Sequence, residues 1–124
     1  MAASLTVNAN LTLSDTGVNV TSNPGTVSYT PTSSLNEQGV FTVPTTAGGV
    51  VIPLGGVTTP GYVQITNLDG TNYVTILTAV SGTAFARIKP SQTMLVFLDP
   101  TLTAPAWVAH TGACKVNFCV TDGA

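Results

Sequence analysis

The chain has 124 residues, of which only 6% are charged, against roughly 25% in an average soluble domain. Its formal net charge is −2 with three Lys and Arg residues, which disfavours nucleic acid as a partner because phosphate binding needs clustered positive charge. No segment has the roughly 18 apolar residues that a membrane helix needs, and the N-terminus lacks the basic start of a signal peptide.

The composition favours an all-β protein. Thr and Val dominate the sequence, and β-branched side chains favour the half-buried surface of a sheet. Sheets with few charges have poorly defended edges, so we expect a subunit whose surface is covered by neighbouring chains. The alternative is a small monomer whose surface consists of Thr, Ser and Asn.

The N-terminal stretch alternates between apolar and polar residues from position 5 to 13, which is typical of a strand with one face against a core. Leu5 and Val7 lie on its apolar side. We expect residues 1–16 to form an N-terminal strand that docks on a neighbouring subunit, which makes Leu5 and Val7 candidate interface residues.

Residues 17–61 contain short apolar runs separated by Pro and Gly. We expect short strands near residues 18–20, 27–29, 40–43 and 50–54, a turn at residues 23–25 and a polar loop at residues 32–38. This region forms either a second sheet or an arm that wraps a neighbour. We expect the second sheet, because the segment that follows needs a cover.

Residues 61–99 form the centre of the predicted fold. Four apolar runs are separated by turn signals at Asp69-Gly70, Ser81-Gly82 and Lys89-Pro90-Ser91. Asp-Gly between alternating runs is a strong hairpin signal. The segment therefore predicts a central antiparallel meander.

The C-terminal part predicts a strand from Trp107 to about His110 and a last strand with a clear alternation. In the last strand Cys114 and Cys119 fall on opposite faces, about 16 Å apart, too far for a mutual disulfide. Two free thiols are typical of a reducing cytoplasm. About ten short strands with regular turns predict one domain over residues 1–124, built as a sandwich, jelly roll or small barrel.

No motif for catalysis, metal or cofactor binding is found, and we expect neither an enzyme nor a cofactor. His110 is the only histidine, and no nucleophile-elbow sequence accompanies it. The five acidic residues are scattered. Asp69 and Asp99 stand at turn signals, where Asp bonds to its own backbone.

Three further residues join the candidate interface. Arg87 and Lys89 alternate along one strand and so point to one face, which is a solvated face, an intersubunit ion pair or an anion site. Trp107, Tyr62 and Tyr73 could stack on sugar rings, but core packing or an interface anchor is the favoured role. The candidate interface residues are Leu5, Val7, Arg87, Lys89 and Trp107.

Four segments carry a family resemblance: Gly55–Val57, Asn67–Val74, Phe85–Pro90 and Val116–Val120. Their pattern of a Gly-Gly-Val turn, N-x-D-x-x-N-Y-V, F-x-x-I-K-P and a closing apolar strand resembles small virion proteins of tailed bacteriophages. The resemblance covers residues 43–120. The first forty residues are similar to these proteins only in the general style of their sequence.

The resemblance implies an antiparallel, jelly-roll-like β-sandwich that is made in the bacterial cytoplasm and fixed onto the virion. It implies a structural role, because some members resemble head decoration (cement) proteins and others resemble tail or fibre parts. We expect a capsid decoration protein, with a tail, baseplate or fibre-associated module that binds host-surface glycan as the alternative. The implied partners are further copies, with a trimer favoured, and the major capsid protein or other virion proteins. Ser91-Gln92 departs from the family, which more often has Gly-Glu there.

Overall fold

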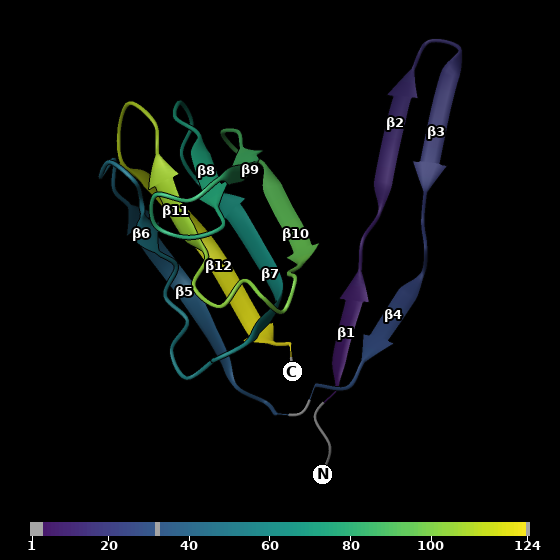
Figure 1. Cartoon of the computed structure of the whole chain (residues 1–124). Coiled ribbons are helices and arrows are strands. Elements are labelled where there is room, and N and C mark those ends of the chain that lie inside the picture. The colour runs from purple at the N-terminus through teal and green to yellow at the C-terminus, as the bar shows by residue number, and fades with distance from the viewer. Residues whose placement is uncertain (1–3, 32, 124) are drawn as a thin grey trace. The chain divides into compact units, whose positions relative to one another are not determined.

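The computed structural model describes residues 4–31 and 33–123, and the regular elements in them are all β-strands (Figure 1). The strands are β1 (Leu5–Asn8), β2 (Leu11–Asp15), β3 (Val18–Ser22), β4 (Thr26–Tyr29), β5 (Asn36–Val43), β6 (Val50–Val51), β7 (Pro60–Asn67), β8 (Val74–Leu77), β9 (Ala84–Ile88), β10 (Thr93–Phe97), β11 (Ala106–Ala109) and β12 (Cys114–Asp122). All pairings are antiparallel. The all-β, antiparallel prediction is confirmed.

The chain divides into two compact units, Met1–Ser33 and Ser34–Ala124. This differs from the single domain predicted for residues 1–124. The physical reason is the position of the core, because its side chains come from Phe41 and later residues. The strands of the first unit pair only with one another.

The first unit is a two-stranded N-terminal ribbon (residues 5–29). β1 pairs with β4, and β2 pairs with β3 beyond them. The chain reverses at Thr16-Gly17, where Gly17 adopts a φ of 79° that favours glycine. Residues 23–25, predicted as a turn, instead interrupt the ribbon between β3 and β4, since both strands belong to the same returning side.

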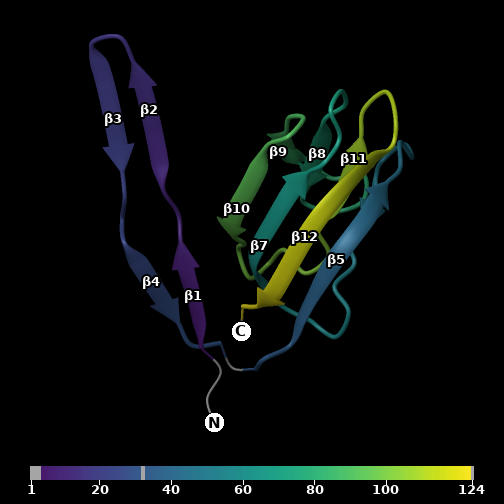
Figure 2. The ribbon, with the colours of Figure 1, turned by 180° about the vertical axis from the view of Figure 1, so that it is seen from behind.

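The second unit is a β-sandwich of two four-stranded sheets. The first sheet has the order β10-β7-β12-β5, which Figure 2 shows side by side, and the second has the order β6-β11-β8-β9. The pairs are nested: β8 with β9, β7 with β10, β6 with β11, and β5 with β12. The second unit therefore follows the path of one long hairpin, whose two halves pair along their length. Successive strand pairs lie alternately in the first and the second sheet.

The predicted meander over residues 61–99 is wrong. β7 and β10 belong to the first sheet, whereas β8 and β9 belong to the second. Only Ser81-Gly82 makes a hairpin. The signals at Asp69-Gly70 and Lys89-Pro90-Ser91 mark crossings between sheets, because a turn signal fixes a change of direction and not the sheet that the next strand joins.

The predicted second sheet from residues 17–61 is also wrong. Its first half lies in the ribbon, β5 joins the first sheet and β6 joins the second. β5 begins at Asn36, inside the predicted polar loop, because its outward positions are Asn and Gln and so look like loop residues.

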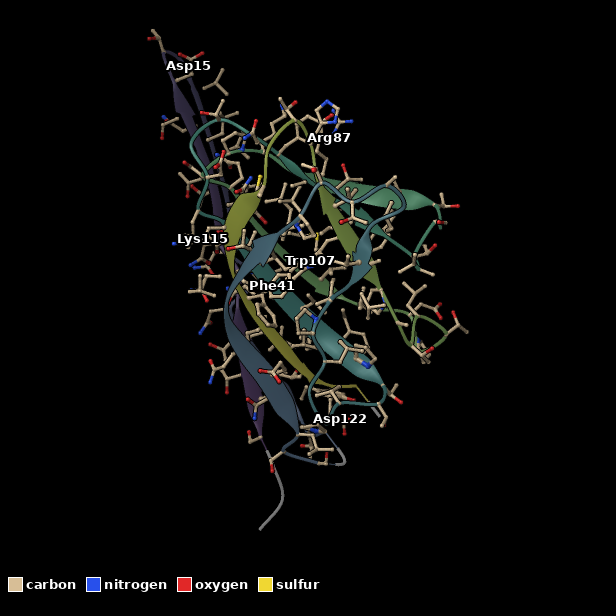
Figure 3. The ribbon with its side chains drawn as sticks, turned by 90° about the vertical axis from the view of Figure 1, so that its left-hand side faces the viewer. Asp15, Phe41, Arg87, Trp107, Lys115 and Asp122 are labelled. Carbon is tan, nitrogen blue, oxygen red and sulfur yellow. The ribbon has the colours of Figure 1, made fainter. Side chains whose placement is uncertain are left out.

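The core lies between the two sheets. Trp107 of β11 is fully buried and stacks on Phe41 of β5, with ring centroids 5.4 Å apart (Figure 3). Aliphatic side chains from both sheets surround it, including Ile65 and Ile76. The burial of these side chains holds the sandwich together.

Candidate interaction surfaces

Two predicted interface residues, Leu5 and Val7, lie on one face of β1. In the ribbon they stand opposite Tyr29 and Val27 of β4, so four apolar or aromatic side chains share that face. Directly opposite residues on antiparallel strands project from the same side. Leu5 and Val7 are both half-buried.

The apolar face continues along the outer half of the ribbon. Leu11, Leu13, Val18 and Val20 are all exposed, and Leu13 stands opposite Val20. Leu11 keeps 73% of its surface in contact with solvent. The alternation predicted one face against a core, and within the first unit no core covers that face, since the described two-stranded ribbon has no second layer. Docking of the strand on a neighbouring subunit stays a prediction.

The reverse face of the ribbon is polar. Thr12 stands opposite Thr21, and the Thr26 hydroxyl donates a hydrogen bond of 2.8 Å to the Asn8 side-chain oxygen. Asp15, the only charged side chain in residues 1–33, stands opposite Val18 and so lies on the apolar face, at the tip of the ribbon. Its carboxylate accepts a 2.7 Å hydrogen bond from the Thr16 amide. The ribbon is thus amphipathic, with one apolar face and one charge at its tip.

We call the solvent side of the first sheet the outer face; it is formed by the outward positions of β5, β7, β10 and β12. Its apolar residues are Val40, Tyr62, Leu95 and Phe97. The Tyr62 and Phe97 rings meet edge to face, with centroids 4.7 Å apart. Lys115 is the only charged residue among the outward positions of these four strands (Figure 3).

The solvent side of the second sheet carries a stack around Tyr73. The Arg87 guanidinium lies 4.1 Å from the centre of the Tyr73 ring, and the His110 ring stacks on it at 4.5 Å. Arg87 and His110 come from opposite sides, since β8 lies between β9 and β11. Lys89 follows β9 directly and is exposed. Arg87 and Lys89 therefore share the predicted face, with His110 beside them.

Trp107 is a core residue, so its prediction as an interface residue is wrong. Its side chain is 0% exposed, and its indole nitrogen has no hydrogen-bond partner among the described residues. The alternation placed Trp107 in a strand correctly but could not tell which side of the strand faces the core. The Tyr73 ring is covered by its two stacked neighbours, which leaves neither Trp107 nor Tyr73 with a free ring face for a sugar.

The loop from β7 to β8 is held by Asn67, a fully buried polar residue that the sequence reasoning passed over. Its amide donates to the carbonyl oxygens of Asn72 and Ile88 at 2.9 and 3.1 Å. In the same loop the Asp69 carboxylate accepts from the Asn72 and Thr71 amides, and these bonds lower the pKa of Asp69. Asp69 thus shapes a loop, as the turn signal indicated.

The two cysteines are free and point to opposite sides of β12, as the alternation predicted. Cys114 is buried in the core, and Cys119 is half-buried on the outer face. Burial raises the pKa of both thiols, and the charge of Asp69 adds to the effect at Cys114.

In the described part of the chain, no group of three or more His, Cys, Asp or Glu side chains is placed to hold a metal ion. None of the described residues forms a helix long and apolar enough to span a membrane. No family model, curated protein or solved structure matches the chain.

Proposed function

We propose that this chain is a structural component of a bacteriophage virion, and that it acts as a capsid decoration protein. It would assemble in the host cytoplasm as a homo-oligomer, with a trimer favoured, and bind the major capsid protein. It would strengthen the particle through buried surface between subunits and not through chemistry. A tail, baseplate or fibre position is the alternative.

The ribbon is the observation that carries this proposal. A two-stranded ribbon is at best marginally stable alone in water. Here the described strands of the first unit, residues 5–29, form such a ribbon and expose several large apolar side chains, among them Leu11 and Leu13. A segment of this kind is stabilised by binding to another subunit, which is what an assembly protein requires.

The nesting of the strand pairs supports the jelly-roll form of the sandwich. A jelly roll is a long hairpin rolled into two sheets, so its first strand pairs with its last, and its fourth with its fifth. The pairs β5 with β12 and β8 with β9 stand in this relation. Viral capsid domains are among the proteins that use this architecture.

Low surface charge supports the same function. Only 6% of the residues are charged, and exposed apolar side chains lie on both units, among them Leu11 and Val40. Large exposed apolar patches mark interaction sites in soluble proteins. The protein is therefore better suited to a packed assembly than to free solution.

The test compares particles with and without the protein. Phage particles assembled without it, and the same particles after addition of the purified chain, are heated and osmotically shocked while DNA release is measured. We expect the chain to bind and to raise the temperature of DNA release. A Leu13→Asp variant should fail to protect, whereas Thr12→Asp, on the polar face of the ribbon, should protect as the wild type does.

Two results would contradict the proposal. One is a chain absent from purified particles by mass spectrometry, which excludes every virion role. The other is a chain present on particles whose heat and shock resistance does not depend on it. That result excludes the decoration role and leaves the tail or fibre position, which electron microscopy of gold-labelled chain would locate.

A further inference from the structure

We infer that the apolar face of the ribbon packs on the outer face of the first sheet in a second copy of this chain. The inference rests on the proposed assembly function and names the partner of the ribbon. The two surfaces occur on the same polypeptide, so each copy offers one surface and needs the other.

Within the described part of the first unit, the ribbon has no second layer against its apolar face. Leu13 and Val20 stand opposite each other on one face, while Thr12 and Thr21 stand opposite each other on the other. Apolar residues on one face of a sheet are buried against a second layer. A second sheet about 10 Å away supplies that layer in sandwich proteins.

The outer face is the sheet surface that fits this layer. It presents Tyr62, Leu95 and Phe97 on neighbouring strands, and Val40 of β5 is 61% exposed. The other outward residues of these strands are mainly uncharged polar ones. The other solvent-facing sheet surface instead carries the Arg87 guanidinium beside Tyr73 and His110. That side carries two positive charges, Arg87 and Lys89, whereas the ribbon brings only Asp15. Covering it would therefore desolvate a positive charge that has no carboxylate to pair with.

The ribbon is long enough to cover the first sheet. The leading side of the ribbon spans residues 5–15, which at about 3.3 Å per residue is roughly 36 Å. β12, at the centre of the first sheet, has nine residues and is about 30 Å long. The ribbon can therefore cover the outer face along the full length of its strands.

The charges are complementary as well. The ribbon carries one charged side chain, Asp15, and the outward positions of the first sheet carry one, Lys115. Opposite charges that face each other fix the register of an interface and suppress wrong pairings. We therefore place Asp15 of one copy beside Lys115 of the next.

The contact allows two kinds of closed assembly. Two copies can exchange ribbons reciprocally in a two-fold dimer, or each ribbon can bind the next copy around a ring. A trimer, the oligomer favoured for the proposed function, is such a ring. Without closure the same contact would form filaments.

The test is a charge exchange in the full-length chain, with self-association measured by sedimentation velocity across concentrations. Asp15→Lys and Lys115→Asp should each raise the dissociation constant about 3- to 10-fold, because like charges then face each other. The double variant should recover wild-type association. Lys89→Asp, which reverses an exposed charge on the other sheet, is the matched control and should neither weaken association nor rescue Asp15→Lys.

A mixing experiment separates contact between copies from contact within one chain. When the two single variants are mixed, the ribbon of the Asp15→Lys variant can bind the outer face of the Lys115→Asp variant with opposite charges facing each other. Mixed oligomers should therefore exceed those of either variant alone. Rescue in the double variant without rescue on mixing would show that the ribbon docks on its own sheet, which overturns the inference.

Cys119 supplies an independent readout in the unaltered chain. It lies on the outer face, so alkylation by a small maleimide should slow as the protein is concentrated and oligomers form. Cys114 is buried in the core and should stay unreactive throughout. Unchanged labelling of Cys119 in oligomers, or rescue of Asp15→Lys by Arg87→Asp, would overturn the inference. Detection of the chain on particles alongside either result would leave the proposed function standing.

Discussion

The Trp107 ring meets the Phe118 ring edge to face, with centroids 5.5 Å apart and planes at 88°. The two residues belong to different sheets, since Trp107 lies in β11 and Phe118 in β12. Edge-to-face contacts of this kind add to the free energy gained by burying the rings themselves. This pair therefore joins the two layers of the sandwich.

Replacing Phe118 with Ala should lower the free energy of unfolding by about 3–5 kcal/mol, because it leaves a cavity beside Trp107. Phe118 is only 5% exposed. The matched control is Phe85→Ala, at a side chain that is 41% exposed, where the loss should stay below about 1 kcal/mol. Urea denaturation followed by tryptophan fluorescence measures both. Equal losses would show that the aromatic pair does not join the sheets.

Gly61 and Gly123 are in close backbone contact. A Cβ atom added at Gly61 would lie 2.5 Å from the Gly123 Cα atom, so β7 and the residue after β12 would have to separate. Gly61→Ala should therefore lower the free energy of unfolding by about 1–3 kcal/mol. Gly70→Ala, where no atom lies within 4 Å of the added Cβ, is the control and should change stability little. An unchanged free energy of unfolding in Gly61→Ala would contradict this close contact.

Acid should destabilise the sandwich through two loop carboxylates. The Asn72 and Thr71 amides lower the pKa of Asp69, and the Thr101 hydroxyl and amide lower that of Asp99, both from an ordinary 3.8. A folded-state pKa below the unfolded one gives stability that is present above the unfolded pKa and is lost as pH falls through the folded pKa.

The melting temperature of the wild type should therefore fall below about pH 4. An Asp69→Asn/Asp99→Asn double variant should show a shallower fall, measured by circular dichroism from pH 6 to 2. Asn117→Ala, which changes no acidic group, should keep the wild-type slope. Parallel curves for the double variant and the wild type would refute this assignment.

A chain that begins at Ser34 should fold by itself. The core cluster contains no side chain from the ribbon, so a chain that begins at Ser34 keeps every residue of that cluster. We expect its melting temperature to lie within about 3 °C of the full chain when both are dilute. A synthetic peptide of residues 1–33 should show no stable strand signal in circular dichroism. Failure of the Ser34 chain to fold would mean that the ribbon contributes to the sandwich.

Several parts of the fold could be read from local patterns. The alternation in the last strand placed Cys114 and Cys119 on opposite faces, and the Ser81-Gly82 signal marked a true hairpin. These features depend on neighbours in the sequence, because side chains alternate along every strand and a tight turn needs particular residues.

Pairings between distant strands could not be read in this way. Asp69-Gly70 has the residues of a hairpin turn, yet the chain there passes from one sheet to the other. The side-chain amide of buried Asn67 stabilises this crossing by donating hydrogen bonds to the carbonyl oxygens of Asn72 and Ile88. No local sequence pattern predicts these bonds.

The sequence by itself determined the all-β class and the low charge, which follow from composition. It also determined which side chains share a face of each strand, because alternation acts between near neighbours. Only the tertiary structure decided that Trp107 lies in the core and that residues 5–29 form a ribbon without one. An apolar face looks the same in sequence whether its cover lies in the same chain or in another. The physical reason is that burial depends on the whole set of long-range pairings.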